Sequence, residues 1–381
     1  STDRRGLRGE TAMGGLQYWV GFNIVPGIGP MRFKALLDYF GDVETAWHAD
    51  ARELKEAGLD RRSIDNLQKM RKKLSLDDEM EKLERAGAYA ITWEDDAYPP
   101  LLRHIQSPPP LLYIKGRIRP EDEWAVAVVG TRRATVYGKE VTRQLVGGLA
   151  RNKITVVSGL ARGIDGQAHR GALEARGRTI AVLGHGIDIV YPAAHRELAA
   201  AIVENGALIT DYPLGTQPEG RNFPPRNRII SGISLGVLVV ECGERSGALI
   251  TADYAAEQGR DVFAVPGNIF NRGSKGVNRL IQEGAKPVLC IEDILEELNL
   301  TMVSQQAEVR AIVPENETES TLLQYISTEP IHLDEVVRTS GLPTALVSST
   351  LAMMELKGMV RRMEGMNYVL IREGKAEYVI E

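Results

Sequence analysis

The stretch RNFPPRNRIISGISLGVLVVECGERSGALITADYAAEQGRDVFAVPG, residues 221–267, decides the fold predicted for this chain. Two apolar runs, 236–240 and 262–265, are typical of buried strands, and a helical pattern at 248–258 lies between them. The polar turn 244–247 leads directly into that helix, whose first amides and positive dipole end favour an anion. The stretch lacks the paired groups that bond breaking usually requires. It therefore predicts a phosphate-binding surface.

Strands and helices alternate on both sides of this stretch, with near-continuous Val, Ile and Leu in the strands. This pattern predicts an α/β fold with a doubly wound parallel sheet that is covered by helices on both faces. In such sheets, ligands bind outside the carboxyl ends of the strands. The expected strands are 125–129, 155–157, 180–183, 207–210, 237–240, 262–265 and 288–291, and the expected helices are 138–151, 165–175, 194–204, 229–233, 248–258 and 277–282.

A chain of 381 residues exceeds what one core usually supports, so two or three domains are expected. Residues 13–75 have helical patterns and predict a small helical domain of the SAM or helix-hairpin-helix type, and the sheet domain is expected at 76–300. A polar, acidic linker is expected at 301–319. Three short helical patterns and two strand-like runs then predict a winged helix at 320–381.

Two features of the flanking domains bear on DNA. The turn VPGIGP at 25–30 resembles that of a helix-hairpin-helix, whose amides can bind a DNA phosphate. Small helical domains also use such turns only for packing, so both interpretations stay open. The recognition helix expected in the winged helix, 344–356, contains no Lys or Arg. DNA-reading helices need basic residues to offset phosphates, so we interpret this domain as a protein-contact or regulatory module.

The composition, 43% hydrophobic and 25% charged residues, is that of a soluble globular protein. No apolar run reaches the ~18 residues of a membrane span, and none follows the N-terminal arginines as in a secretory signal. The two cysteines, Cys242 and Cys290, lie in apolar runs, so we expect buried, reduced thiols. The spacings of structural zinc sites are absent. A cytoplasmic protein is expected.

The charge is uneven along the chain, whose net value is −5. Residues 126–290 carry 20 Lys and Arg against 14 Asp and Glu, whereas residues 291–381 carry 7 against 16. A basic middle in an acidic protein favours an anionic partner for the sheet domain. A chance imbalance on a solvated face would give the same counts, so the charge alone does not decide.

Polar residues follow the first strand of the predicted parallel sheet. Gly130 there allows a ligand to approach the backbone, and Arg132 can donate two hydrogen bonds to phosphate oxygens. A structural turn would explain Gly130 but not the adjacent pair of Arg132 and Arg133. The segment is not G-x-G-x-x-G, and the second strand ends in Ser158 and Gly159 rather than in an acidic residue. Both differences argue against a dinucleotide-dependent dehydrogenase.

The segment FPPRNR places an aromatic ring, Phe223, before three donor-rich side chains. These are Arg226, Asn227 and Arg228. Stacking of a base on an aromatic ring is worth ~1–3 kcal/mol and tolerates any sequence. We therefore interpret the segment as a loop that suits single-stranded nucleic acid better than a free nucleotide. The structural alternative, with Phe223 in the core and Arg228 in a salt bridge, stays open.

Other polar residues follow later strands. Asp165 and His169 lie one helical turn apart, and no Ser or Cys nucleophile accompanies them, so we interpret them as a helix cap with its partner. His185 and His195 are interpreted as turn residues. A donor-rich turn that contains Asn268 follows the last strong strand pattern.

Several of these motifs occur together in one known family. They are VGTR at 129–132, SGLARGID at 158–165 with His169, YP at 191–192, FPPRNRIISG at 223–232, SGALITA at 246–252 and VPG at 265–267. In this order they closely resemble the DNA-processing protein A family, also called DprA or Smf. The helical domain and the winged helix fit the three-part layout of many members. His185 and His195 depart from the commoner pattern and leave the role of that turn open.

This resemblance implies an extended Rossmann-like fold and a non-enzymatic protein that binds single-stranded DNA. It also implies a homodimer formed through that fold and the loading of RecA recombinase onto incoming strands in natural transformation. Arg132 would be a phosphate ligand, and Ser246 would donate from its helix start. The DNA-binding residues expected from the residues and the resemblance together are Gly130, Thr131, Arg132, Arg221, Phe223, Arg226, Asn227, Arg228, Ser246 and Asn268. No catalytic residue, metal or cofactor is expected.

Two alternatives belong to other functional classes. A nucleotide-binding, phosphoribohydrolase-like enzyme would share the sheet, but such enzymes resemble each other in a P-G-G-x-G-T-x-x-E segment, which residues 243–249 do not match. A winged-helix regulator that senses a small ligand in the sheet domain is disfavoured because its recognition helix is not basic.

Overall fold

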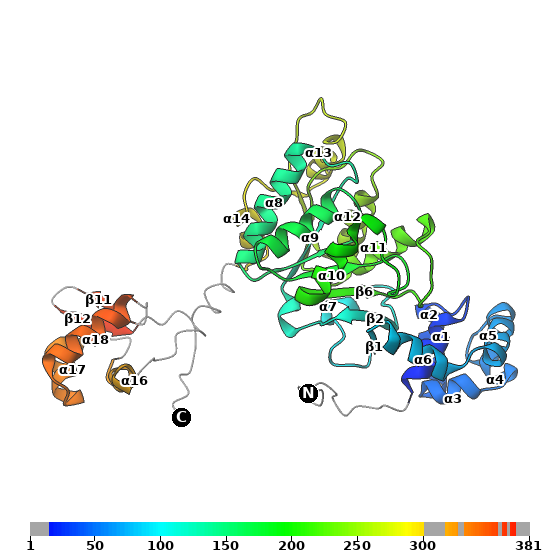
Figure 1. Ribbon diagram of the computed structural model, residues 1–381, viewed down its shortest axis with the longest axis horizontal. Coiled ribbons are helices and arrows are strands. Elements are labelled where there is room, and N and C mark those ends of the chain that lie inside the picture. The colour runs from blue at the N-terminus through cyan, green and yellow to red at the C-terminus, as the bar shows by residue number, and fades with distance from the viewer. Residues whose placement is uncertain (1–14, 301–316, 327–330, 357–359, 364–365, 371–381) are drawn as a thin grey trace. The chain divides into compact units, whose positions relative to one another are not determined.

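The chain divides into two compact units, Ser1–Leu298 and Asn299–Glu381. The computed structural model, drawn in Figure 1, describes residues 15–300, 317–326, 331–356, 360–363 and 366–370. None of the helices within these ranges combines the length and the apolar character that a bilayer crossing requires.

Short helices around an aromatic core begin the larger unit. Trp19, Phe22, Phe33 and Trp47 are buried together there, and side chains such as Asp60, which accepts from the Ser63 amide, cap the helix starts. The helices are α1 (Leu16–Ile24), α2 (Pro30–Phe40), α3 (Val43–His48), α4 (Ala51–Glu56), α5 (Arg61–Lys73) and α6 (Leu76–Arg85).

The turn between α1 and α2 is held by α5. The carbonyl of Pro26 accepts a hydrogen bond of 2.9 Å from Asn66, and that of Gly27 accepts one of 3.3 Å from Ser63. The turn that resembles a helix-hairpin-helix therefore has a packing role in this domain.

A nine-stranded sheet forms the centre of the larger unit, in the order β1-β2-β6-β5-β4-β3-β7-β8-β9. All neighbours from β6 to β9 pair in parallel, whereas β1 and β2 are antiparallel additions at one edge. The strands are β1 (Tyr89–Thr92), β2 (Leu111–Gly116), β3 (Ala125–Val129), β4 (Thr155–Ser158), β5 (Thr179–Val182), β6 (Gly206–Thr210), β7 (Gly236–Val239), β8 (Asp261–Ala264) and β9 (Lys286–Pro287).

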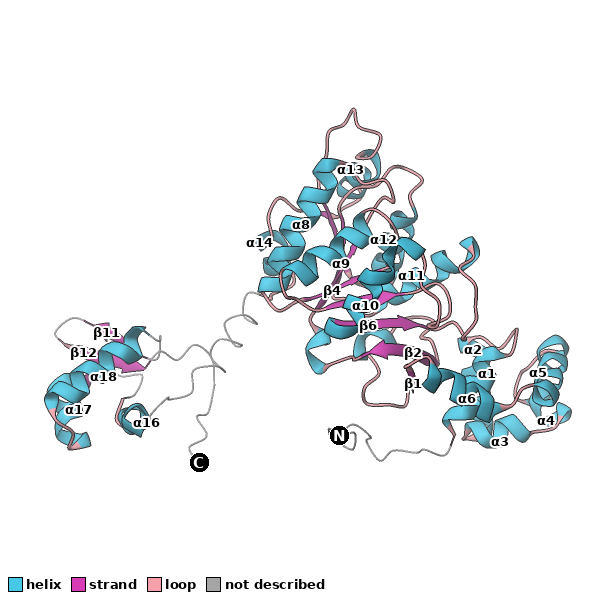
Figure 2. Ribbon diagram, in the orientation of Figure 1, coloured by secondary structure: helices cyan, strands magenta, loops and turns pink. Residues whose placement is uncertain are grey.

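Helices cover both faces of this sheet (Figure 2). Ala181 of β5 belongs to the core cluster that contains Leu198 of α10. Its neighbours Ile180 and Val182 belong to the cluster that contains Ile229 of α11. The helices are α7 (Pro100–Arg103), α8 (Val136–Arg151), α9 (Ile164–Glu174), α10 (Arg196–Asn205), α11 (Phe223–Gly232), α12 (Gly247–Glu257), α13 (Lys275–Gln282) and α14 (Glu292–Glu297), with short 3-10 helices at Pro120–Glu123, Ala193–His195 and Gly220–Asn222. The predicted α/β fold with a doubly wound, mostly parallel sheet is confirmed.

The strand order reverses at β3. The chain runs from β3 through β4 and β5 to β6 on one side and then returns to β7 and β8 on the other. Ligands of doubly wound sheets bind at the carboxyl end of such a switch point. The loops after β3 and β7 are therefore the places to look for a site.

The smaller unit is a winged helix, as predicted. Leu322, Val336, Leu351 and Tyr368 are buried in its core. Its elements are α16 (Glu317–Leu323), β10 (Ile331–His332), α17 (Leu333–Ser340), α18 (Thr344–Leu356), β11 (Val360–Met363) and β12 (Asn367–Leu370), and the strands pair in the order β10-β12-β11. Helix α16 begins inside the linker expected at 301–319, of which residues 301–316 lie outside the described part.

Two predictions near the end of the sheet are wrong. Residues 288–291 do not form a strand, because the amides of Leu289 and Cys290 donate to the carboxylate of Asp293, at 2.7 and 3.0 Å. This capping turns the chain out of the sheet and into α14. Cys290 is consequently exposed, whereas Cys242 is buried as expected.

Candidate nucleic-acid interface

A buried carboxylate holds the loop after β3 in place. The main-chain oxygen of Glu241 accepts the Thr131 amide at 2.7 Å. Its side chain accepts the amide and the hydroxyl of Thr135, both at 3.0 Å. A Cβ at Gly138 would push the same carboxylate away from Thr135, so the first turn of α8 favours glycine there. Sequence reasoning missed Glu241, although an acidic residue directly after the apolar run GVLVV was a visible signal.

Gly130 has a packing role. A Cβ there would lie 2.6 Å from the Ile164 side chain and 2.9 Å from the main-chain oxygen of Glu241. The amide of Ile164 in turn donates to the carbonyl of Thr131 at 3.1 Å. The loops after β3 and β4 are thereby locked together. Arg132 projects from this fixed backbone and is exposed.

The sequence had suggested that the FPPRNR segment is a loop, but the segment forms the first part of α11. Pro224 and Pro225 occupy its first turn, where a missing amide hydrogen costs nothing. Phe223 begins the helix and is partly buried over the loop after β5, where a Cβ at Gly184 would lie 2.7 Å from its ring. The aromatic ring of the site is therefore positioned by the N-terminal end of α11.

The ring of Phe223 lies among cationic and aromatic groups. Its centre is 5.7 Å from the guanidinium carbon of Arg132 and 6.0 Å from the ring centre of Tyr191. The Tyr191 ring is 6.4 Å from that of His185. Tyr191 is 45% exposed and extends the aromatic surface. Sequence reasoning did not name it as a site residue, although the YP pair at 191–192 was among the matching motifs.

Arg226 is directed into the protein. It is only 4% exposed, and its guanidinium donates to the carbonyls of Gly159, at 3.1 Å, and Val182. Burial lowers the pKa of Arg226 to about 10, which the nearby carboxylate of Asp165 opposes. Burial also raises the pKa of Asp165, and the charge of Arg226 counters that shift. Arg226 therefore fastens the ends of β4 and β5 beneath Phe223.

The next two donors are also bonded inside the protein. Asn227 is buried and donates to the carbonyl of Gly247 at 3.4 Å. Arg228 forms an ion pair with Asp211 at 2.8 Å, which is the salt-bridge alternative left open by the sequence. Together with Arg226, these side chains are engaged inside the protein, whereas the sequence had suggested contacts with DNA.

The remaining expected contacts lie at the edge of the site. Ser246 caps α12 by accepting the Ala248 amide at 3.3 Å, and Asn268 is exposed on the loop after β8. Arg221, just before Phe223, is exposed and paired with Glu219 at 2.7 Å. The structure thus brings Arg132 and Phe223 together. Thr131 and Arg221 are close to them in the chain, whereas Ser246 and Asn268 lie on the loops after β7 and β8.

Asp165 and His169 do not form a cap and its partner, so that interpretation is wrong. Helix α9 begins after Gly163, and Asp165 accepts the amide of Ala161 at 3.4 Å. His169 is fully buried, and its Nδ1 lies 2.6 Å from the hydroxyl oxygen of Thr179. Burial lowers the pKa of His169 to about 3, so the ring is neutral. His195 bonds the Leu160 carbonyl at 3.0 Å, a structural contact.

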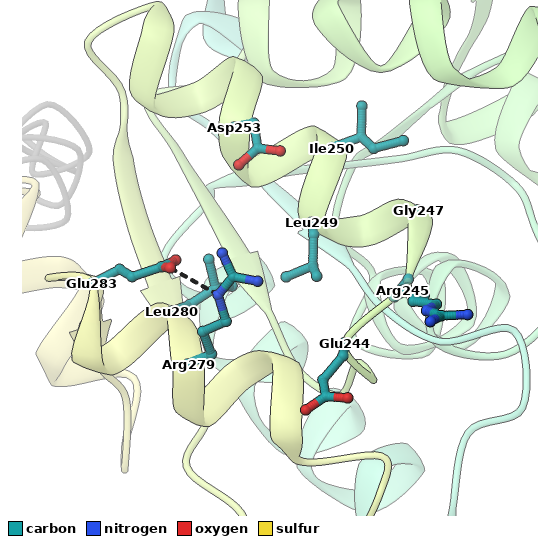
Figure 3. A pocket seen from close by; sticks show the side chains of 10 residues that line it. Glu244, Arg245, Gly247, Leu249, Ile250, Asp253, Arg279, Leu280 and Glu283 are labelled. Carbon is teal, nitrogen blue, oxygen red and sulfur yellow. Dashed lines mark hydrogen bonds and ion pairs between the residues drawn. The ribbon is translucent and has the colours of Figure 1, made fainter.

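A pocket of about 370 Å³ lies between α12 and α13, and Ser246 contributes to its lining (Figure 3). Its lining includes the carboxylates of Glu244, Asp253 and Glu283 against the guanidiniums of Arg245 and Arg279. Arg279 is already paired with Glu283 at 2.8 Å. This excess of carboxylates does not suit a phosphate. Within the described residues, no group of three acidic, His or Cys side chains is placed to hold a metal.

The switch point itself is basic. Arg132, Arg133 and Arg162 are exposed there, and none of them forms an ion pair with another described residue. Unpaired arginines beside partly exposed rings fit a chain that carries both phosphates and bases.

Known proteins resemble this chain over most of its length. The DNA recombination-mediator protein A family matches residues 89–299, and the DprA winged helix domain matches residues 306–366. The protein Smf of Synechocystis is 35% identical, and the similarity covers 92% of this chain and 98% of that protein.

Two solved structures are also similar. DNA processing protein A from Streptococcus pneumoniae has a TM-score of 0.66 at 35% identity, over 74% of this chain and 97% of that one. The protein from Helicobacter pylori, described for its single-stranded DNA binding mode, has a TM-score of 0.51 at 29% identity, over 56% of this chain and 97% of that one. The chain therefore belongs to the DNA recombination-mediator protein A family, also called DprA or Smf.

Proposed function

We propose that this protein binds single-stranded DNA at the carboxyl edge of its sheet and acts as a recombination mediator. The observation that carries the proposal is the Arg132 guanidinium over the Phe223 ring, 5.7 Å from its centre, beside further unpaired arginines. The guanidinium supplies donors for a phosphate, and the ring supplies a face for a base. The single-stranded DNA binding mode described for the Helicobacter pylori relative supports this choice of ligand.

The site residues have different roles in this proposal. Thr131 and Arg132 contact the backbone of the strand, Gly130 fixes their loop, and Phe223 stacks on a base. The helix start at Ser246 offers further donors. Contacts at the flanks come from Arg221 and Asn268, and Arg226, Asn227 and Arg228 support the helix that carries Phe223.

The wider activity follows the family. The protein loads RecA recombinase onto incoming single strands in natural transformation, in the cytoplasm and as a homodimer formed through the sheet domain. It does so without catalysis or a cofactor, since the site is built to hold a strand. We divide the chain into a helical domain at 13–75, the DNA-binding domain at 76–300, a linker at 301–319 and the winged helix at 320–381.

The test is binding of a labelled oligonucleotide, single-stranded or double-stranded, over a series of salt concentrations. We expect tighter binding of the single strand, because stacking on Phe223 needs an unpaired base. The logarithm of the affinity should fall linearly with the logarithm of the salt concentration. The steepness of this line, the salt slope, should be about 0.7 for each phosphate contacted on a single strand. Equal affinity for both forms would contradict the proposal.

A further inference from the structure

The loop after β8 exposes two large apolar side chains. Ile269 is 71% exposed and Phe270 is 87% exposed. Nearby, Val136 at the start of α8 is 86% exposed. Exposed apolar patches on folded domains commonly mark binding sites. The sheet and helices give no internal reason for an aromatic ring at this position.

The loop is held rigidly in this exposed form. Asn278 of α13 accepts the Gly267 amide at 3.1 Å and donates to the Gly267 carbonyl at 2.9 Å. The side chain of Asn268 accepts the Phe270 amide at 2.9 Å, and that of Asn271 accepts the Gly273 amide, also at 2.9 Å. These bonds fix the backbone that displays Phe270, so a ligand would meet a preformed surface.

This loop adjoins the loop that carries Arg132. Glu241 lies between them, because its carboxylate accepts from Thr135 on one side and would lie 2.7 Å from a Cβ at Gly273 on the other. The hydroxyl of Tyr137 donates to the carbonyl of Pro266 at 3.3 Å and joins the same two segments. The residues that flank Phe270 in its loop are thus joined to the start of α8, which follows the loop that carries Arg132.

The charges around Phe270 favour an anionic ligand. Arg272 is exposed and forms no ion pair with a described residue, and Arg133 is in the same state on the neighbouring loop. Lys275 has only a long contact of 3.9 Å with Glu244. A second copy of this chain, docked symmetrically on this surface, would place the same cations opposite one another. A nucleic-acid strand would neutralise them.

We infer that Phe270 and Arg272 form a second binding position for the same DNA strand, where a base stacks on Phe270 and a phosphate meets Arg272. This inference rests on the proposed function and extends its site. The strand would run from Phe223, above the end of β5, to the end of β8. Four strand spacings of ~4.8 Å separate those ends, so the path is roughly 19 Å long. An oligonucleotide must therefore exceed a minimum length to reach both rings.

The experiment compares Phe270→Ala with the unaltered protein on oligothymidylates of 3 and 16 nucleotides. The shorter one cannot span a path of roughly 19 Å, and the longer one lies at the upper end of the usual site sizes of ~4–16 nucleotides. We expect the 16-mer to lose affinity by about 5- to 160-fold, as loss of one stacked base predicts, while the 3-mer is unaffected. Phe270→Trp should retain binding of the 16-mer. Arg272→Ala should lower the salt slope for the 16-mer by about one phosphate. Met31→Ala, which removes a 71% exposed side chain from α2, is the matched control.

Three results would overturn the inference. If Phe223→Ala weakens binding of the 16-mer but Phe270→Ala does not, the strand does not reach the β8 loop, and the proposed function still stands. If Phe270→Ala instead dissociates a dimer in sedimentation, the surface is an interface between copies. Failure of the unaltered protein to bind either oligonucleotide would reject the proposed function itself and the inference with it.

Discussion

The guanidinium of Arg132 lies over the ring of Phe223, with 5.7 Å between its central carbon and the ring centre. Arg132 stands on the loop after β3, and Phe223 begins α11. Their contact joins two sides of the sheet edge into one surface. A guanidinium over an aromatic face is attracted to the ring and keeps its planar fork pre-organised for a phosphate.

Replacement of Arg132 tests the phosphate contact. Arg132→Ala should weaken binding to every sequence and lower the salt slope by about one phosphate. Arg132→Lys keeps the charge but loses the planar guanidinium that can donate two hydrogen bonds to one phosphate. Affinity should therefore fall while the salt slope is retained. The measurement is fluorescence anisotropy over a salt series. Arg151→Ala, on an exposed arginine at the far end of α8, is the control. An unaltered slope in Arg132→Ala would reject its phosphate role.

Replacement of Phe223 tests base stacking. Phe223→Ala should cost ~1–3 kcal/mol of binding free energy with little change in salt slope, because no charge is removed. Phe223→Trp should preserve binding. The thermal midpoint is measured alongside, since the ring also packs over Gly184. If Phe223→Ala unfolds and Phe223→Leu restores both fold and affinity, the ring is a packing residue and not a stacking platform.

The fold was predictable because runs of Val, Ile and Leu mark the buried strands of the sheet. Strand β3 has the bounds expected from the sequence, and most other strands lie within a residue of theirs. The start of α11 was missed because Pro224 and Pro225 were interpreted as loop residues, although a first helical turn tolerates proline. The strand expected at 288–291 was lost to a local competitor, the Asp293 carboxylate.

The site was predictable in place but not in the direction of its side chains. The motif supplied Arg226 and Arg228 as donors, but their acceptors come from other elements: the carbonyls of Gly159 and Val182 and the carboxylate of Asp211. Such partners are set by the packing of the sheet, which local sequence does not encode. The sequence could therefore suggest arginines near the bound DNA. It could not distinguish the side chains that bind DNA from those that hold the site in place.

Replacement of Arg226 distinguishes these two roles. Arg226→Ala removes the buried cation that acts on Asp165 and leaves two carbonyls without their donor. A buried polar group that loses its partner costs about 1–3 kcal/mol. We expect a large fall in the free energy of unfolding in urea, with an unchanged salt slope for the protein that remains folded. Arg221→Ala, at an exposed ion pair, should leave stability nearly unchanged. A stable Arg226→Ala protein with a lower salt slope would instead make Arg226 a phosphate ligand.

Removal of the winged helix tests its part in DNA binding. Helix α18 contains no Lys or Arg, so a chain that ends at Leu300 should bind single-stranded DNA as tightly as the full chain and with the same salt slope. The comparison is made at equal salt on the same oligonucleotide. A lower slope in the shortened chain would show that the winged helix also contacts phosphates.

The buried His169 predicts a loss of stability in acid. The hydroxyl of Thr179 donates to the carbonyl of Val156 at 2.8 Å, so Nδ1 of His169 donates to Thr179, and Nε2 has no partner within the described residues. Burial lowers the pKa of His169 from 6.5 to about 3, with smaller contributions from His195 and the nearby arginines. The unfolded chain therefore binds the proton more readily than the folded one. The resulting stability is present above pH 6.5 and is lost as the pH falls from there toward 3. Between pH 7 and 5 this one group should lower the free energy of unfolding by about 2 kcal/mol.

Urea unfolding at pH 7 and pH 5 measures this loss of stability. The variant His169→Gln, which cannot take up the proton, should show a smaller loss. An equal loss in both proteins would assign the acid sensitivity to other groups.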